Sequence, residues 1–406
     1  RRNHNMEAVN RDILSDNFRL EGMKLPDLKK DLQMMNETTK IVEVTPSDLT
    51  LYSIVGMKKN EFYAARLLPD EISHEMFFPT SQRQEYLKRE ENYGKLDIGS
   101  LRNKGFTSEM IKDIYETGFF FQVKVDKRYI SLVPSKLFLS TLCNQLDCGK
   151  MQLGRNIFRD LYLCTLLQNN ESFKIIYRTD SGKVGRILGA ASSKFSITPE
   201  DTVKFLWTNL KLEDKYRIYY YRITHAKTII NFMKGTVDSS LSHKIYFGCR
   251  FSYSDIGRGS YTLESTVIRG GAIMPLDDAI TRKHVGEFPV KDFVDNYRKK
   301  NVIHKVIQNL NRASKKKISS VRKTVTAFIK SNEFTKVNGA KATKKLMMDE
   351  DFFLSMPDDV GTEFDAIYWT GAIVDYYLNQ KTDIQYEALC RYVGKIWKEG
   401  LKKYAK

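Results

Sequence analysis

Three runs of acidic residues have the composition of a divalent-cation site, because carboxylate oxygens are the usual ligands of such ions. They are Asp277-Asp278, Asp349-Glu350-Asp351 and Asp358-Asp359. No histidine or further acid stands at a fixed spacing from them, so helix starts and solvated loops explain them better. The six histidines lack H-E-x-x-H spacing, the five cysteines lack zinc-site spacing, and no G-x-S-x-G motif is present. The sequence therefore predicts no catalytic residue, no metal site and no cofactor, and an enzyme is the weaker interpretation.

Two arginine-bearing turns are candidates for contact with phosphate. Arg258 lies in the glycine-rich run 257–260, whose backbone N–H groups can face an anion. This run lacks the Lys-Ser/Thr of a P-loop, and a strand pattern follows it where a helix is needed, so we interpret it as a hairpin turn. Arg178 and Arg186 flank a second hairpin, and we expect all three arginines to form one anion-contacting surface. The alternative is that Arg178 and Arg186 are structural partners of Asp180 or Glu200.

Tyrosines lie among arginines in the strand pattern of residues 216–223. Alternation along a strand predicts Tyr219 and Tyr221 on one face, with Tyr220 and Arg222 on the other. Exposed aromatic rings of this kind stack on the bases of single-stranded nucleic acid. The alternative is a half-buried strand whose tyrosines fill a core.

The positive charge is concentrated in one part of the chain. Residues 291–345 contain sixteen Lys or Arg and three acids, a net +13 of the whole chain's +17. Such asymmetry favours a polyanionic partner. No Gly or Pro occurs between Pro289 and Gly339, and from Ile303 to Ile329 the apolar residues keep a helical period.

This period predicts one amphipathic helix over residues 302–330, preceded by a break near residues 299–301. Five cationic residues share the side opposite the apolar stripe: Lys305, Arg312, Lys316, Lys323 and Lys330. We expect them to contact phosphate while the stripe docks on the core. Two alternatives remain open: an ordinary solvated face, and a membrane-surface helix, which usually carries Trp and more Leu or Phe.

Hairpin patterns interleave with helical ones, which predicts an α+β fold of antiparallel hairpins and helices. The chain has 406 residues and is 42% hydrophobic, which excludes wholesale disorder, and no apolar window is long enough to span a membrane. We expect four parts: a polar N-terminal arm (1–40), an α+β core (41–290), a basic helical segment (291–348) and an acidic helical tail (349–406). The tail either folds back on the basic helix or masks it until nucleic acid arrives.

Short motifs follow one another between residues 132 and 286. They are Leu142-Cys143-Asn144-Gln145-Leu146 with Gly149, Arg178-Thr179-Asp180 with Arg186-Ile187-Leu188, Ser192-Ser193-Lys194-Phe195, Ser254-Asp255-Ile256-Gly257-Arg258-Gly259-Ser260, Arg269, and His284-Val285-Gly286. In this order they resemble a family of phage- and plasmid-encoded proteins defined only as a domain of unknown function. Tyr253 and Phe195 depart from the family's Asn and Tyr, and no Cys-x-Asn-Gly follows Arg269. The resemblance implies a mobile-element origin and a cytoplasmic or virion setting, and it implies no reaction.

These observations predict a phage- or plasmid-type nucleic-acid-binding protein of the host cytoplasm, acting in single-strand binding or annealing. DNA is favoured over RNA as the partner, and no membrane partner is expected. The alternative is a structural or internal virion protein with self-assembly or virion partners. Its maturation by proteolysis would explain why the chain begins with Arg1 in place of Met.

Overall fold

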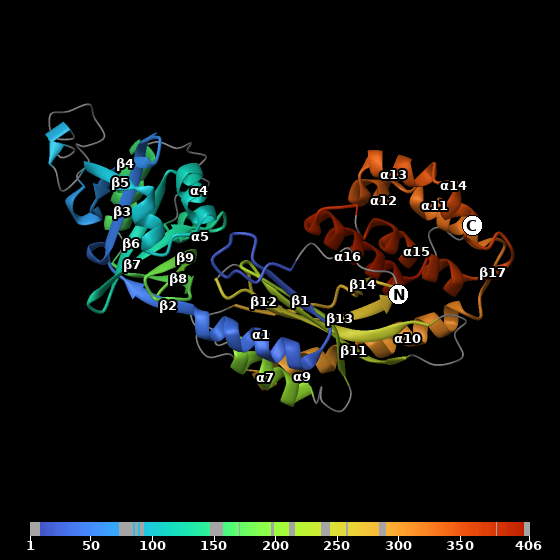
Figure 1. Ribbon diagram of the computed structural model, residues 1–406. Coiled ribbons are helices and arrows are strands. Elements are labelled where there is room, and N and C mark those ends of the chain that lie inside the picture. The colour runs from blue at the N-terminus through green and yellow to red at the C-terminus, as the bar shows by residue number, and fades with distance from the viewer. Residues whose placement is uncertain are drawn as a thin grey trace.

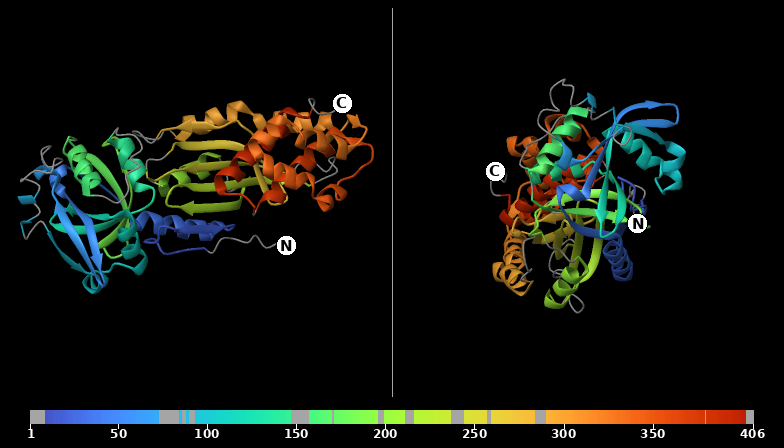
Figure 2. Two further views of the ribbon diagram at one scale, coloured as in Figure 1. Left: turned by 90° about the horizontal axis from the view of Figure 1, so that it is seen from above. Right: turned by 90° about the vertical axis from the view of Figure 1, so that its left-hand side faces the viewer.

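Two β-sheets and a helical body lie in a row, which confirms the α+β class (Figure 1, Figure 2). The computed structural model describes residues 9–72, 84–85, 88–89, 93–146, 157–169, 171–195, 199–210, 216–236, 244–256, 259–283, 290–378 and 380–401. The first sheet lies at one end of the row, the C-terminal helices lie at the other, and the second sheet lies between them. Within these described ranges, no helix has both the length and the apolarity needed to cross a membrane.

The first lobe is built on an eight-stranded sheet with the order β2-β8-β9-β7-β6-β3-β4-β5. Its neighbouring strands are antiparallel, except that β7 and β9 are parallel. The strands are β2 (Thr39–Val44), β3 (Leu49–Lys58), β4 (Glu61–Leu67), β5 (Tyr93–Asp97), β6 (Phe119–Val125), β7 (Arg128–Pro134), β8 (Phe173–Thr179) and β9 (Val184–Ala191). The helices are α3 (Ile98–Asn103), α4 (Ser108–Thr117), α5 (Phe138–Gln145) and α6 (Ile157–Gln168). β6 and β7 form an antiparallel hairpin, and the predicted hairpin flanked by Arg178 and Arg186 is present as β8–β9.

The second sheet has the order β1-β10-β11-β12-β13-β14, and β15 also pairs with β13. Its strands are β1 (Arg19–Gly22), β10 (Arg217–Thr224), β11 (Thr228–Thr236), β12 (Tyr246–Tyr253), β13 (Tyr261–Arg269), β14 (Ala272–Pro275) and β15 (Ile280–Arg282). Three helices cover one face: α1 (Leu25–Thr38), α7 (Pro199–Leu210) and α9 (Val290–Lys300).

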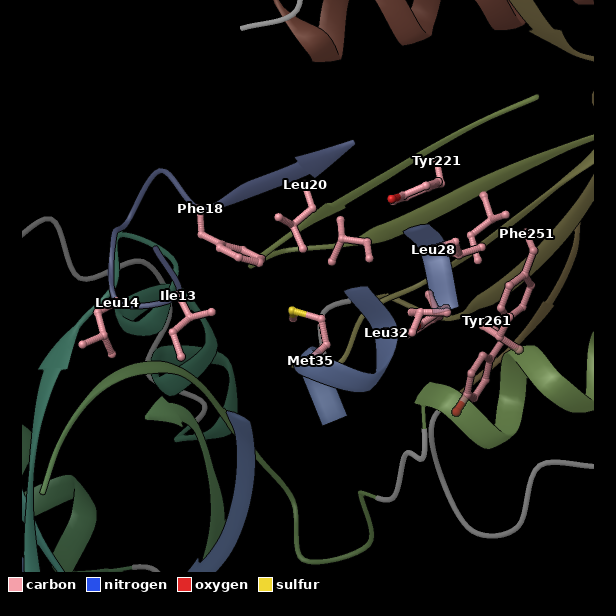
Figure 3. Packing of buried hydrophobic residues seen from close by; sticks show 14 of the residues in the cluster. Ile13, Leu14, Phe18, Leu20, Leu28, Leu32, Met35, Tyr221, Phe251 and Tyr261 are labelled. Carbon is pink, nitrogen blue, oxygen red and sulfur yellow. The ribbon is translucent and has the colours of Figure 1, made fainter. Parts of the chain in front are cut away.

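The core of this face also contains the N-terminal segment, residues 9–22. Figure 3 shows Ile13 and Leu14 beside the first lobe and Phe18 and Leu20 beside the second sheet. All four side chains are buried. The N-terminal segment therefore joins the two sheets through apolar contacts, since burying one such side chain typically contributes about 1.5–3 kcal/mol.

The C-terminal helical body, residues 302–401, packs at the far end of the second sheet. Its elements are α10 (Val302–Ala313), β16 (Lys317–Ile318), α11 (Val321–Ile329), α12 (Asn332–Asn338), α13 (Ala340–Met347), α14 (Glu350–Leu354), β17 (Gly361–Thr362), α15 (Glu363–Tyr377) and α16 (Asp383–Glu399). α15 is the central helix of this body, and most of its residues are buried. α16 lies on the second sheet, where Arg391 donates to both carboxylate oxygens of Glu264 at 2.7 and 2.9 Å. Gly394 permits this approach, because a Cβ there would lie 1.8 Å from the Pro275 carbonyl oxygen.

The observed grouping differs from the four predicted parts. Residues 19–22 form a strand paired with β10, so the predicted arm at 1–40 contributes to the second sheet. The predicted core at 41–290 contains two separate sheets. The tail at 349–406 does fold back on the basic segment and shares one hydrophobic core with it. This grouping results from pairings between distant parts of the chain, such as β1 with β10, which cannot be predicted from local composition.

Candidate nucleic-acid interface

The basic segment, residues 291–345, begins with a break between two helices. α9 ends at Lys300, and Asn301 has the left-handed backbone conformation with φ 49° before α10 begins at Val302. Tyr297 of α9 faces the core of the second sheet, whereas Val306 of α10 faces the core of the helical body. Two adjacent helices that bury different faces in different cores need a change of direction. The break predicted near residues 299–301 is confirmed.

The single helix predicted over residues 302–330 is wrong. The chain leaves the helix after Ala313, pairs Lys317–Ile318 with Gly361–Thr362 as a short antiparallel ladder, and begins α11 at Val321. The Ser320 hydroxyl caps α11 by accepting from the Lys323 N–H at 3.1 Å. A serine cap can start a new helix without Gly or Pro, so the absence of those residues did not guarantee continuity.

The apolar stripe of the basic segment docks on the folded body, as predicted. Its buried members are Val306, Leu310, Ile318, Val321, Val325, Phe328 and Ile329. They form one cluster with residues of α15 and α16, including the fully buried Trp397. These contacts fix the orientation of α10 and α11, and with it the direction in which the opposite sides of both helices point.

All five predicted phosphate contacts of this segment are exposed, but they do not share one helix face. Lys305 and Arg312 are two turns apart on α10, and Lys323 and Lys330 are separated by the same seven residues across α11 and its C-cap. Lys316 lies in the connection, where its Nζ is 3.1 Å from Oε2 of the buried Glu363.

Every Lys and Arg between residues 291 and 345 is exposed, except Arg322, which is partly buried and pairs with Asp358 at 3.1 Å. Four of these cations lie on α9, beside the second sheet, and the others lie in the helical body, where Lys316 and Arg322 pair with acids of the tail.

A pocket of about 210 Å³ opens where α10, α15 and α16 meet. Arg312 and Lys316 lie among its lining residues, together with Asn309, Leu310, Ala313, Glu363, Ile367, Trp397, Glu399 and Gly400. Gly400 has φ 84° and ends α16, which lets the Leu401 N–H donate to Glu363 Oε1 at 3.2 Å. Sequence reasoning missed this pocket, because its walls come from helices almost 90 residues apart and the only local signal is the helix start at Thr362.

The arginine hairpin does not form an anion-contacting surface. Arg178 and Arg186 are both fully buried. Arg178 Nη2 lies 2.6 Å from Asp255 Oδ2, and Arg186 Nη1 lies 2.7 Å from Asp113 Oδ2. The structural alternative is therefore correct, but the partners are Asp255 and Asp113 where Asp180 was predicted. The side chain of Glu200, the other predicted partner, lies outside the described part of the chain.

Burial of the two arginines follows from the position of β8 and β9. The Arg186 Nε–H donates to the Leu14 carbonyl at 2.8 Å, and the Arg178 guanidinium stacks on the Phe18 ring at 5.2 Å. The N-terminal segment therefore covers both side chains and turns the hairpin into a junction between the lobes. Burial also lowers the pKa of Arg178, although the nearby Asp255 carboxylate opposes that shift. The predicted contact at Arg258 lies outside the described residues.

The two tyrosines predicted to share a face lie on opposite faces of the second sheet. A register shift between Ile218 and Tyr220 breaks the alternation of β10. Tyr221 is fully buried in the core beneath the sheet, and its hydroxyl donates to Asp31 Oδ2 at 2.7 Å. Tyr219 is partly buried, and its hydroxyl donates to the Gly270 carbonyl at 2.8 Å. The core alternative is correct for Tyr221, which has no surface on which a base could stack.

In the part of the chain that the structure describes, no group of three or more His, Cys, Asp or Glu side chains is placed to hold a metal ion. Comparison with family models, with curated proteins and with solved structures finds no match to this chain. The resemblance of residues 132–286 to a phage and plasmid family therefore stays a prediction.

Proposed function

We propose that the protein binds nucleic acid through the exposed cations of the basic segment. The observation that carries the proposal is the concentration of sixteen cationic side chains and only three acids in 55 residues, with all but one of these cations exposed. A surface of this kind neutralises phosphates and releases their counterions, which supplies affinity without reading sequence. Sequence-independent binding suits a protein of phage or plasmid type that coats or anneals DNA strands.

The buried stripe favours nucleic acid over a lipid surface. A membrane-surface helix needs a free apolar face to insert between lipid headgroups. On α10 and α11 that face is occupied by the core of the helical body, with Leu310 and Phe328 fully buried. What these helices offer to a partner is their charged side alone.

A binding titration tests the proposal. Affinity for single- and double-stranded DNA and RNA is measured by fluorescence anisotropy at two salt concentrations. We expect log K to fall linearly with log salt, with a slope of about −0.7 per contact on single strands and about −0.9 per contact on duplex. No measurable binding to any of the four at low salt would refute the proposal.

A further inference from the structure

An open groove of about 450 Å³ lies in the helical body, where α13 meets the start of α14 and the end of α15. We call it the α13 groove, and its lining residues are Lys341, Lys344, Lys345, Met348, Asp349 and Tyr376. We propose that this groove holds one unpaired nucleotide of a bound strand, with the phosphate on the lysines and the base on Met348. The inference rests on the proposed function and adds to it a preference for single strands.

The three lysines lie on one side of α13. Lys341, Lys344 and Lys345 stand at positions i, i+3 and i+4, which share a helix face, and all three side chains are exposed. Leu346 points the other way and is fully buried in the core of the helical body. Packing of Leu346 therefore fixes the direction of the lysines, and their ammonium groups are accessible to an approaching phosphate.

Helix stability alone does not explain this row of lysines. Like charges three and four residues apart on a helix repel one another. Within the described ranges no acid lies within ion-pair distance of the three lysines, and Lys345 donates to the neutral Gln380 side chain at 3.3 Å. Lys341 is also the second residue of α13, where the positive end of the helix dipole disfavours a cation. A bound phosphate relieves both repulsions, because it places an anion among the ammonium groups.

The one acid among the lining residues is held by donors of the helical body. Asp349 Oδ1 accepts from the Phe352 N–H at 3.0 Å, and Asp349 Oδ2 accepts from the Tyr376 hydroxyl at 2.9 Å. The first of these hydrogen bonds caps α14. Three lysines and one acid leave the groove with a net charge of +2, so an anionic ligand is the class that it fits.

Met348 gives the groove an accessible apolar surface. Its side chain is 72% exposed, and thioether sulfurs make favourable contacts with aromatic rings. Tyr376 lines the same groove and is partly exposed, and its ring packs edge-on against Phe352 and Tyr377 at centroid distances of 5.5 and 4.9 Å. A base can therefore lie on Met348 while its phosphate lies on the lysines.

The volume of the groove suits one nucleotide, since pockets for drug-sized ligands occupy about 300–1,000 Å³. The bases of a duplex are stacked and paired inside the helix, and extruding one of them costs energy that a single strand does not spend. The lysines can meet the phosphates of either form, whereas Met348 can meet only an unpaired base. The α13 groove therefore adds a preference for single strands to a surface that otherwise recognises charge.

Removing the lysines tests the phosphate contact. The groove variant carries Lys341→Gln, Lys344→Gln and Lys345→Gln. The control carries Lys29→Gln, Lys58→Gln and Lys104→Gln, at exposed positions of α1 and the first lobe, and loses the same charge. The probes are a 12-residue oligodeoxyadenylate and inorganic polyphosphate, which has the charge but no bases. We expect the groove variant to bind both more weakly and to lose about 0.7 of the log–log salt slope on the single strand for each phosphate contact removed.

The control variant should keep the wild-type slope. Wild-type affinity and slope in the groove variant would overturn the groove while leaving the charge-based function intact on other cations. Equal losses in the two variants would overturn it too, because general attraction would then explain both. Absence of binding by the wild type would instead refute the proposed function.

Truncating Met348 tests the base contact. We expect Met348→Ala to weaken binding of the oligodeoxyadenylate by about 2- to 12-fold, the range for loss of one sulfur–aromatic contact. Its affinity for polyphosphate and for the duplex with oligothymidylate should stay unchanged. Leu354→Ala is the matched control, because Leu354 is 69% exposed on α14 and outside the groove lining. Unchanged single-strand affinity of Met348→Ala, or equal weakening toward polyphosphate, would overturn the inference.

A measurement on the wild type does not depend on how the variants fold. Hydrogen peroxide oxidises exposed methionines, and mass spectrometry follows each of them. Met23, which is 60% exposed between β1 and α1, is the internal control for Met348. We expect saturating oligodeoxyadenylate to slow the oxidation of Met348 and to leave that of Met23 unchanged. Oxidation of Met348 at its free rate in the saturated complex, or equal slowing at Met23, would overturn the inference.

Discussion

Arg178 and Asp255 form a buried ion pair across the two lobes: Arg178 belongs to β8 of the first sheet, and Asp255 follows β12 of the second. Their Nη2 and Oδ2 atoms are 2.6 Å apart, and both side chains are at most 5% exposed. Sequence reasoning placed Arg178 at a nucleic-acid surface, whereas the structure places it at the junction. The pair links the two lobes, so its loss should lower the free energy of unfolding.

Arg178→Ala should lower the free energy of unfolding by about 3–5 kcal/mol, because it leaves the Asp255 carboxylate buried without its cation. Chemical denaturation measures this. Arg128→Ala, at an exposed position of the first lobe, is the control and should change stability by less than about 0.5 kcal/mol. If Arg178→Ala weakened nucleic-acid binding per folded molecule and left stability unchanged, Arg178 would be a nucleic-acid contact and not a structural residue.

His225 completes the junction in a neutral form. Its Nδ1 accepts from Arg178 Nη1 at 2.6 Å, and its Nε2–H donates to the Ser15 carbonyl at 2.6 Å. Protonation of Nδ1 would place a second N–H against the Arg178 guanidinium. Burial, together with the charges of Arg178 and Arg186, holds the pKa of His225 well below its usual range. The Asp255 carboxylate, 2.6 Å from Arg178 Nη2, moderates this repulsion.

A His whose pKa is lowered on folding binds its proton more readily in the unfolded chain. Its contribution to stability is therefore complete above the unfolded pKa of about 6.5 and falls as the pH drops below it, by about 1.4 kcal/mol per pH unit at most. We expect wild type to lose more stability between pH 7.5 and 5.5 than His225→Gln, which has no such proton to bind. Denaturation curves at both pH values measure the difference. Parallel losses in the two proteins would assign the pH dependence to other groups.

The docking of α10 on the core gives a third prediction. Leu310 is fully buried against α15 and α16, so Leu310→Ala should cost about 2–5 kcal/mol of stability through lost contacts and a cavity. Ile384 offers a matched control, because it is 84% exposed on α16 and Ile384→Ala removes apolar atoms that are already in water. Thermal melts of the two variants measure the contrast. An unmoved melting temperature for Leu310→Ala would mean that α10 does not dock.

Local patterns were sufficient where local forces decide the structure. The β8–β9 hairpin follows from its turn residues, and the break at Asn301 follows from a change in the phase of the apolar residues. The charge of the basic segment and its exposure likewise follow from composition, because lysine side chains are rarely buried without a partner.

Non-local contacts decided the rest. Arg178 and Arg186 are buried only because the N-terminal segment, about 170 residues earlier in the chain, covers them. The break between α10 and α11 is accompanied by pairing of Lys317 with Thr362. The register shift between Ile218 and Tyr220 places the Tyr219 side chain on the opposite face from Tyr221, and no residue type in the strand predicts that shift. Each of these depends on a partner surface that a single stretch of sequence does not specify.

Because α10 and α11 are separate helices, the contribution of each to nucleic-acid binding can be tested on its own. Each helix presents its own pair of exposed cations: Lys305 and Arg312 on α10, and Lys323 and Lys330 on α11 and its C-cap. Replacing all four and Lys316 with Gln should reduce the steepness of the log–log salt dependence by about 0.7–0.9 for each phosphate contact removed. Replacing one pair should remove about two contacts if that helix meets the strand, so the two double variants show which helix contributes.

The control removes the same charge elsewhere. Lys29, Lys58, Lys104, Lys124 and Lys127 are exposed on α1 and the first lobe, and their replacement with Gln also lowers the net charge by five. Loss of affinity and slope only in the basic-segment variant would localise the interface, because general attraction depends on net charge and a phosphate contact depends on position. Equal losses in both quintuple variants would show that the chain attracts polyanions through its overall charge alone. An unchanged slope in the basic-segment variant, with its melting temperature preserved, would remove α10 and α11 from the interface.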